Sequence, residues 1–159
     1  MPVLSGSSRG FTLGESLFVL LILSLTLAAA YPNLRHWQVR LQEKAEARAL
    51  LAAFQQARAE AARRNCSVLL DFREADTLQG GGYRILAQEA DGSLRELQAL
   101  TPFSALRLER ARFGTSSRGG FNQRGLPSNG SGSVDLRSRC GQASYRLTLS
   151  LYGSVRLEV

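Results

Sequence analysis

The chain has 159 residues, of which 44% are hydrophobic and 21% are charged, an ordinary composition for one globular domain with its own core. The net charge is +7, and Lys44 is the only lysine, so arginine carries almost all of the positive charge. This balance favours anionic partners such as nucleic acid or lipid headgroups, although a solvated basic surface is the simpler interpretation. The two cysteines match no metal-binding spacing, so no metal site is expected.

An apolar run extends from Phe11 to Tyr31 and contains a single carboxylate, Glu15. A helix over this run would cross a bilayer at ~1.5 Å per residue. A secretory signal peptide would have a basic start, an apolar centre and small residues such as those at 28–30, but its apolar centre usually spans only about 7–15 residues. A plain signal anchor explains the length of the run and leaves Glu15 and the sharp border at Gly10 unexplained.

A third interpretation accounts for every feature of this terminus. A short polar leader ends in Gly10 and is followed by Phe11-Thr12-Leu13, one free position, Glu15 and an unbroken apolar helix. This order resembles the class III signal of type IV pilins and type II secretion pseudopilins. The resemblance implies that a prepilin peptidase cleaves the chain after Gly10 and methylates Phe11.

The same resemblance gives Glu15 a role in filament assembly. Its carboxylate would face the new terminal amine of Phe11 on a neighbouring subunit. In a low dielectric each charge lowers the cost of burying the other, so the pair would fix the register of stacked helices. Other pilin-like subunits are therefore expected partners, together with the prepilin peptidase and inner-membrane lipid.

The chain is expected to have four segments. Residues 1–10 form the leader peptide, 11–31 a transmembrane helix, 32–65 an amphipathic helix and 66–159 a globular β domain. The resemblance implies a bacterial, single-pass protein of the inner membrane with a cytoplasmic N-terminus and a periplasmic C-terminal domain. The charges that flank the span do not favour this orientation, which therefore rests on the resemblance.

The segment that follows the apolar run is rich in Ala, Leu, Arg, Glu and Gln, which predicts a helix up to Asn65. Its apolar residues form two stripes on roughly opposite sides, one made of Leu34, Trp37, Leu41 and Ala45, and the other of Leu50, Phe54, Ala57 and Ala61. We expect the second stripe to pack on the β domain. The first stripe would contact neighbouring subunits or lipid headgroups.

Beyond Asn65, short segments of alternating polarity are separated by glycine-rich turns, a pattern that predicts strands. The predicted strands lie at 66–72, 83–90, 94–100, 105–113, 133–139, 145–152 and 154–159. Residues 114–132 are expected to form an exposed loop with a short strand around Phe121. One long helix packed on two small antiparallel sheets is an α+β fold.

The last two segments predict a hairpin with one buried face. Leu147, Leu149 and Leu151 would line that face, and a three-residue loop at 152–154 would keep the two strands in register. Arg146 and Arg156 would then point to solvent from the opposite face.

No catalytic or cofactor chemistry is expected. His36, the only histidine, lies at the membrane exit, far from any candidate nucleophile. The glycines at 80–82 lack the lysine of a phosphate-binding loop. Cys66 and Cys140 flank most of the β domain, and we expect them to form one disulfide, with two buried thiols as the alternative.

Three segments of the globular part extend the resemblance to the GspH/FimT family of minor pseudopilins and minor pilins. They read ARAEAARRNCSVLLDF, FNQRGLPSNGSGSVDL and YRLTLSLYGSVRLEV. The H branch of the family implies a structural subunit at the tip of the type II secretion pseudopilus, without catalytic activity. Related minor pilins imply the alternative, a subunit that primes type IV pilus assembly.

FimT-like members of the family bind DNA for natural transformation through a C-terminal Gly-Arg-x-Arg. The matching positions here run from Gly153 to Arg156 and keep only the second arginine, since residue 154 is serine. Arg118, Arg124, Arg137 and Arg139 could add phosphate contacts, and Arg146 would be available beside Arg156 on the solvent face of the hairpin. Protein secretion is therefore the favoured interpretation and DNA binding is not, although the sequence alone does not choose between the two systems.

Overall fold

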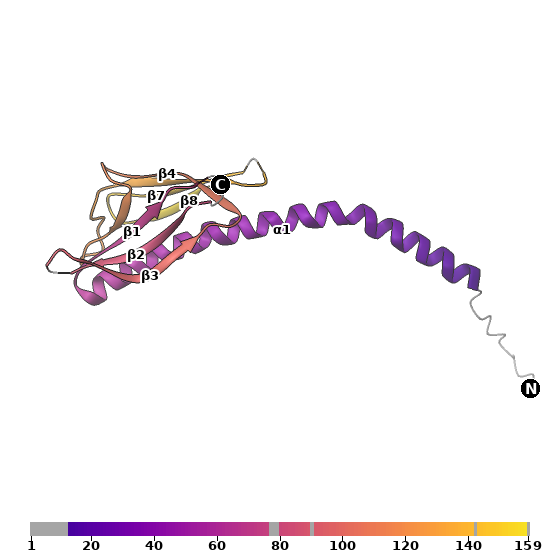
Figure 1. The fold of residues 1–159 in the computed structure, drawn as a ribbon, viewed down its shortest axis with the longest axis horizontal. Coiled ribbons are helices and arrows are strands. Elements are labelled where there is room, and N and C mark those ends of the chain that lie inside the picture. The colour runs from indigo at the N-terminus through magenta and orange to yellow at the C-terminus, as the bar shows by residue number, and fades with distance from the viewer. Residues whose placement is uncertain (1–12, 77–79, 90, 142, 159) are drawn as a thin grey trace, which may run out of the picture. The chain divides into compact units, whose positions relative to one another are not determined.

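The computed structural model describes residues 13–76, 80–89, 91–141 and 143–158. The chain divides into two compact units, residues 1–38 and 39–159. One helix, α1 (Leu13–Arg64), begins in the first unit and ends in the second (Figure 1). The predicted cleavage and methylation residues, Gly10 and Phe11, lie outside the described residues.

The described part of the first unit consists of the N-terminal part of α1. Its large apolar side chains are exposed, for example Leu17 at 59% and Phe18 at 62%. Among the described residues, α1 is the one helix that is long and apolar enough to cross a membrane, and none of its most apolar stretch is buried. Within the described part of the first unit, these side chains are therefore not packed in a protein core.

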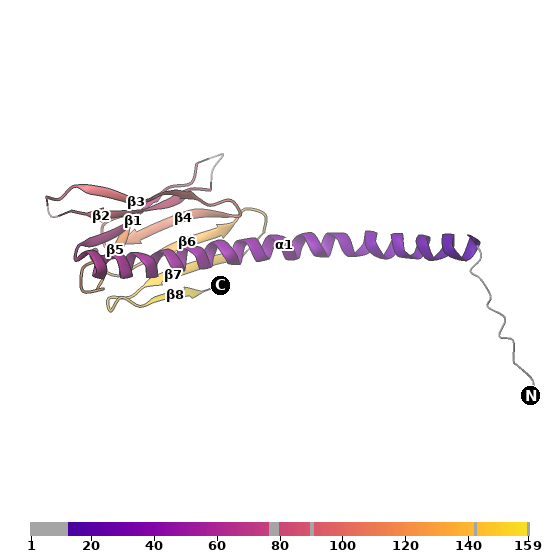
Figure 2. The same cartoon turned by 90° about the horizontal axis from the view of Figure 1, so that it is seen from below.

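The second unit contains the rest of α1 and two four-stranded antiparallel sheets (Figure 2). Sheet A has the order β3-β2-β1-β5 and contains β1 (Ser67–Arg73), β2 (Gly82–Gln88), β3 (Leu94–Pro102) and β5 (Arg118–Phe121). Sheet B has the order β4-β6-β7-β8 and contains β4 (Leu106–Phe113), β6 (Gly132–Ser138), β7 (Ser144–Leu149) and β8 (Val155–Glu158). The predicted α+β fold is confirmed, including the short strand that ends at Phe121.

The helix stops where the sequence offers a residue that tolerates a left-handed backbone. Asn65 has a φ of 51°, and the Cys66 N–H donates to the Ala61 carbonyl at 3.3 Å. This bond closes the last helical turn, and β1 begins at Ser67. The chain thus reverses from helix to central strand within two residues.

The core lies between the second half of α1 and both sheets. The predicted stripe of Leu50, Phe54, Ala57 and Ala61 is fully buried. The Phe54 ring lies 6.2 Å from Phe72 of sheet A and 5.9 Å from Phe113 of sheet B, measured between centroids. One helical side chain therefore joins both sheets.

Two glycines make room for Phe113, the sheet B member of this cluster. A Cβ at Gly119 would lie 2.5 Å from the Phe113 ring, and a Cβ at Gly132 would also collide with it. Phe113 is fully buried as a result. Both positions must therefore remain glycine for the ring to occupy this slot.

The register of the last hairpin corrects one prediction. Leu149 pairs with Val155 and Leu147 with Leu157, so the strands are shifted by two residues from the expected pairing. The reason is the turn itself, because Ser150 N–H donates to the Ser154 carbonyl at 2.9 Å and Gly153 takes a φ of 78°. The three-residue loop is therefore 151–153. A shift of two keeps the faces as predicted but leaves Leu151 outside the core, 65% exposed.

The expected disulfide is also wrong, because both cysteines are free thiols. Cys140 lies in the β6–β7 turn, where its N–H donates to Ser138 Oγ at 3.2 Å, and Ser138 in turn donates to Glu43 of α1. Cys66 follows the other end of this part of the helix. At ~1.5 Å per residue the helix separates Glu43 from that end by roughly 30 Å, whereas a disulfide requires Cα atoms within about 7 Å.

Candidate assembly and anion-binding surfaces

The first candidate site is the start of the apolar helix. Glu15 lies in the first turn of α1, and its side chain is exposed. The residues that follow Glu15 in the helix are mostly apolar and exposed, and the next charged residue is Arg35. The arrangement provides one carboxylate at the end of an apolar helix, as the sequence predicted, and its predicted partner Phe11 lies outside the described residues.

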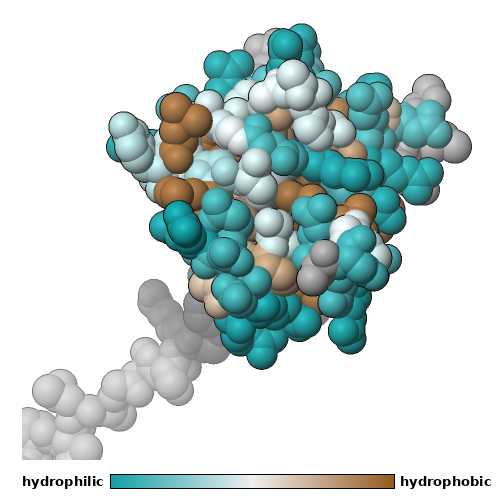
Figure 3. All heavy atoms as spheres, turned by 90° about the vertical axis from the view of Figure 1, so that its left-hand side faces the viewer, coloured by the Kyte–Doolittle hydropathy of each residue, from teal (hydrophilic) through white to brown (hydrophobic). Residues whose placement is uncertain are grey.

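The globular unit carries few large apolar side chains that could serve as an alternative assembly surface. Those that are exposed among its described residues are Leu41, Leu94, Leu100, Leu126, Leu151 and Tyr152. Figure 3 shows hydrophilic residues covering most of the face seen there, with small apolar areas between them. The apolar surface that needs a partner is therefore concentrated on α1.

Glu46 attaches α1 to the loop between β3 and β4. Its carboxylate accepts hydrogen bonds from the backbone N–H groups of Ser104 at 3.0 Å, Ala105 at 2.9 Å and Leu106 at 3.0 Å, and from the Ser104 hydroxyl. Burial by itself would raise the pKa of Glu46, but these hydrogen bonds outweigh burial and hold the pKa below its ordinary value of 4.5. The carboxylate is thus ionised at neutral pH and closes an otherwise unpaired turn.

Glu43 attaches the same stretch of helix to sheet B. It is 2% exposed, accepts a hydrogen bond from the Ser138 hydroxyl, and lies 3.4 Å from the Tyr145 hydroxyl. Burial raises the pKa of Tyr145, and the negative charge and hydrogen bond of Glu43 raise it further. Both glutamates therefore hold the first turns of the packed half of α1 against the sheets.

Sequence reasoning missed both glutamates, because only the apolar residues of this helix were used to define its packing faces. A signal was present for Glu43. Extending the buried stripe backwards from Leu50 by three and seven residues reaches Ala47 and Glu43, both of which are buried. A carboxylate on a buried stripe needs a specific partner, and here it has one.

The four arginines predicted as DNA contacts are divided between sheet A, sheet B and a loop. Arg118 belongs to sheet A, where its guanidinium lies 2.9 Å from Asp71, and Arg84 lies 2.7 Å from the same carboxylate. Burial alone would raise the pKa of Asp71, but the two arginines outweigh it and lower the pKa. Arg124 lies in the loop after β5 and is exposed.

Arg146 and Arg156 do share a face, as predicted. They lie on the outer face of sheet B, opposite the buried Leu147 and Leu149. Arg146 is engaged by Asp135 at 2.7 Å. The outer face of the sheet also carries Arg137, which the sequence suggested as a further phosphate contact, and three arginines that were not singled out from the sequence, namely Arg107, Arg110 and Arg112.

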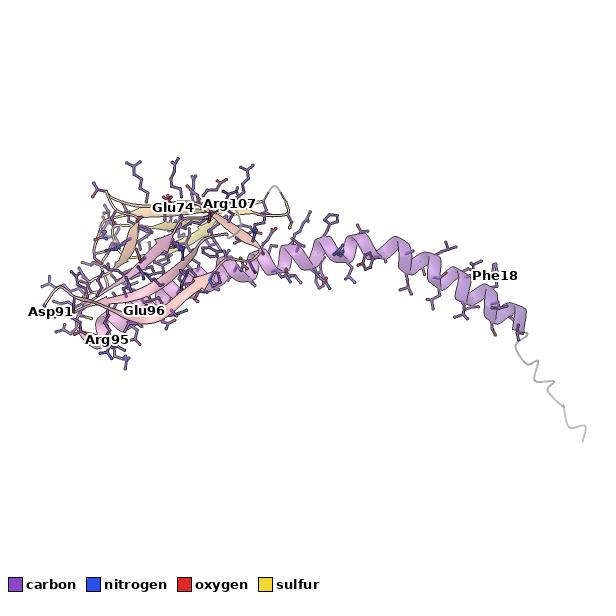
Figure 4. All side chains as sticks on the ribbon, viewed as in Figure 1. Phe18, Glu74, Asp91, Arg95, Glu96 and Arg107 are labelled. Carbon is purple, nitrogen blue, oxygen red and sulfur yellow. The ribbon has the colours of Figure 1, made fainter. Side chains whose placement is uncertain are left out.

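A cleft of about 850 Å³ lies over the outer face of β4 and β6. Its lining includes Arg107 and Arg137 together with Glu74 from the β1–β2 connection, and Figure 4 shows Glu74 beside Arg107. Arg137 is paired with Glu109 at 3.1 Å. Charges of both signs line the cleft, and no group of three or more His, Cys, Asp or Glu in the described part of the chain is arranged to hold a metal ion.

Comparison with known proteins identifies the family. The family described as Type II transport protein GspH matches residues 46–153, which is more than half of the chain. The chain belongs to this GspH family. The family is structural rather than enzymatic, and its pilin-like character implies contacts with other pilin subunits and anchoring by the apolar helix.

Solved structures of GspH-like fold agree with the architecture. The minor pseudopilin EpsH from the Type 2 Secretion System of Vibrio cholerae has a TM-score of 0.56 at 15% identity, covering 73% of this chain and 95% of that one. The type IV minor pilin FimU of Pseudomonas aeruginosa is similar in two crystal forms. One has a TM-score of 0.57 at 21% identity, covering 76% of this chain and 90% of FimU. The other has a TM-score of 0.53 at 19% identity, covering 73% of this chain and 92% of FimU. No curated protein matches the sequence.

Proposed function

We propose that this GspH-family chain is an H-type minor pseudopilin of a type II secretion system, with a structural role in assembly and no enzymatic activity. The observation that carries the proposal is the continuity of α1. Its first half exposes apolar side chains, and its second half is fixed in a GspH-type β domain by buried residues and two glutamates. Such a subunit can enter a helical bundle of neighbours through α1 while the β domain remains intact.

The N-terminal chemistry follows from the leader. A prepilin peptidase removes residues 1–10 and methylates Phe11, and Glu15 then pairs with the amine of Phe11 on the adjacent subunit. Inner-membrane lipid surrounds the apolar helix before assembly, with the N-terminus in the cytoplasm and the β domain in the periplasm. Burying Glu15 without a partner would be costly, so the pairing selects neighbours in the correct register.

The test separates membrane insertion from assembly. Glu15→Leu should insert into the membrane as well as the wild type, because a costly carboxylate is gone, and should be depleted from filaments purified through another subunit. Ser16→Leu is the matched control, since it adds the same side chain at the next helical position. Equal recovery of Glu15→Leu and wild type in the purified filaments would show that the carboxylate has no role in assembly.

The likeness to FimU supports a second candidate, a minor pilin of a type IV pilus. A type II secretion subunit is needed for protein secretion, whereas a type IV pilus subunit is needed for pili. Deleting the gene should reduce secretion of type II substrates and leave type IV pili intact under the favoured proposal. Loss of pili with normal secretion would instead select the pilus subunit. DNA uptake is the less favoured form of this candidate, because Arg118 is paired with Asp71 on sheet A and residue 154 is not arginine.

A further inference from the structure

The outer face of sheet B contains a row of four residues that runs across all four strands. Arg112 of β4 is paired with Ser133 of β6, Ser133 with Thr148 of β7, and Thr148 with Arg156 of β8. We name these residues the Arg112 row. The two arginines are exposed and the two hydroxyl residues are half-buried, so two guanidinium groups flank two hydroxyl groups on one surface.

A β-bulge explains why Arg112 lies on this face. The pairing of β4 with β6 shifts between Leu108 and Arg110, so that Glu109 and Arg110 both point outward. Arg112 then follows on the outer face, and Phe113 returns to the core. The same bulge therefore positions the arginine and the core aromatic residue next to it.

The neighbouring row on one side neutralises its own charge. It consists of Arg110, Asp135, Arg146 and Glu158, which alternate in sign across the four strands. Arg146 and Asp135 form an ion pair at 2.7 Å. Opposite charges that face each other across strands stabilise a sheet, so this row needs no further partner.

The Arg112 row has no such compensation. Residues on its other side are uncharged, since the next outward positions are Gly114, Ser131, Ser150 and Ser154. Within the described part of the chain, Arg112 and Arg156 form no ion pair, and the hydroxyls of Ser133 and Thr148 form no hydrogen bond. A depression of about 510 Å³ lies at one end of the row, lined by Arg112, Ser131, Ser133 and Thr148 with no carboxylate.

We propose that the Arg112 row binds a phosphate-class oxyanion. Adjacent strands are about 4.8 Å apart, so the two arginines are separated by roughly 14 Å at their Cα atoms and their long side chains can converge above the hydroxyls. A tetrahedral oxyanion can accept from both guanidinium groups and both hydroxyls, and its oxygens point in more directions than the two coplanar oxygens of a carboxylate. The inference does not depend on the assembly role of α1.

Inorganic phosphate is the first probe, added to the full chain in a nonionic detergent at constant ionic strength. The melting temperature should rise with phosphate concentration, because a ligand that binds the folded state stabilises it. Arg112→Gln and Arg156→Gln should each weaken the apparent affinity about tenfold, the loss expected for one charge-assisted contact. Arg107→Gln, on the same strand and face, is the matched control and should bind as the wild type does.

The hydroxyl residues separate a built site from general attraction to a basic surface. Ser133→Ala combined with Thr148→Val leaves the net charge unchanged and should still weaken phosphate binding several-fold. Ser154→Arg places a third arginine beside the Arg112 row and should strengthen phosphate binding. Loss of binding in Arg107→Gln to the same extent as in Arg112→Gln would overturn the proposal, as would an unchanged affinity in all row variants.

A short DNA duplex is the second probe and identifies the source of the phosphate. If the row takes the backbone phosphates of nucleic acid, Arg112→Gln should weaken DNA binding at every sequence and reduce the salt dependence by about one phosphate contact. Phosphate binding without DNA binding would support the row as a site for a free or small-molecule phosphate. Absence of any response to either probe in the wild type would refute the site.

Discussion

Glu46 shows how one side chain determines the position of an element. Three consecutive backbone N–H groups at residues 104–106 point to its carboxylate, which supplies the acceptor that this loop lacks. Glu43, one turn earlier on the helix, performs the same task for sheet B through Ser138. The two contacts define where α1 stops being a free helix and becomes part of the domain.

The lowered pKa of Glu46 predicts a specific dependence of stability on pH. Because the folded-state pKa lies below 4.5, the stabilisation is present at neutral pH and disappears as the pH falls from the unfolded-state value through the folded-state value. Glu46→Gln should reduce the free energy of unfolding by ~1–2 kcal/mol at neutral pH and much less in acid. Denaturant titrations at both pH values measure this. Glu74→Gln, at an exposed loop carboxylate, is the control, and an equal loss in Glu46→Gln at both pH values would contradict the account.

The cysteines give a second prediction at this scale. Cys140 is exposed and Cys66 is half-buried at the start of the sheet, with much of the length of the domain between them. Thiol labelling of the denatured, non-reduced protein should therefore modify two residues. Labelling of neither cysteine in monomeric protein would demonstrate a bond that this fold does not allow.

At the scale of elements, Phe113 and its two glycines hold sheet B against sheet A. Gly119 belongs to β5 and Gly132 to β6, so the aromatic ring lies in a slot formed by both sheets. Neither residue has a side chain that contributes contacts. Their role is to let two sheets approach a buried ring closely.

This slot predicts a coupling between substitutions. Gly119→Ala should destabilise the protein by ~1–3 kcal/mol, because the added methyl group overlaps the Phe113 ring. In a Phe113→Leu background Gly119→Ala should reduce the free energy of unfolding by less, because the smaller leucine side chain leaves room for the added methyl group. Chemical denaturation of the four proteins measures the coupling. Additive effects of the two substitutions would show that the ring and the glycine do not meet.

The elements could be predicted from local patterns, while their partners could not. Alternation of polarity located the strands, and the stripe of Leu50 and Phe54 identified the buried side of α1. The register of the last hairpin was missed because the alternation of polarity placed Leu151 in the strand, whereas Ser150 and Ser154 close the turn one residue earlier. The Arg112 row escaped notice because its members come from four strands, and neither the bulge in β4 nor the strand order can be read from local sequence.

At the scale of the whole molecule, the chain combines a helix that exposes apolar side chains with a domain that buries its own. The family match begins at residue 46, so it covers the domain and not the apolar segment. The leader and Glu15 therefore carry the part of the proposal that concerns the filament. Both are predicted from residues 9–15, and both depend on processing at Gly10.

Mass spectrometry of the chain purified from cells that contain a prepilin peptidase tests this claim most directly. The proposed assembly subunit should lack residues 1–10 and begin with a methylated Phe11, and Gly10→Val should prevent both changes. Mature protein that begins at Tyr31 would establish a cleaved signal peptide and a chain without the apolar first part of α1. An intact leader in the presence of the peptidase would equally contradict the proposed entry of this chain into a pilin-like assembly.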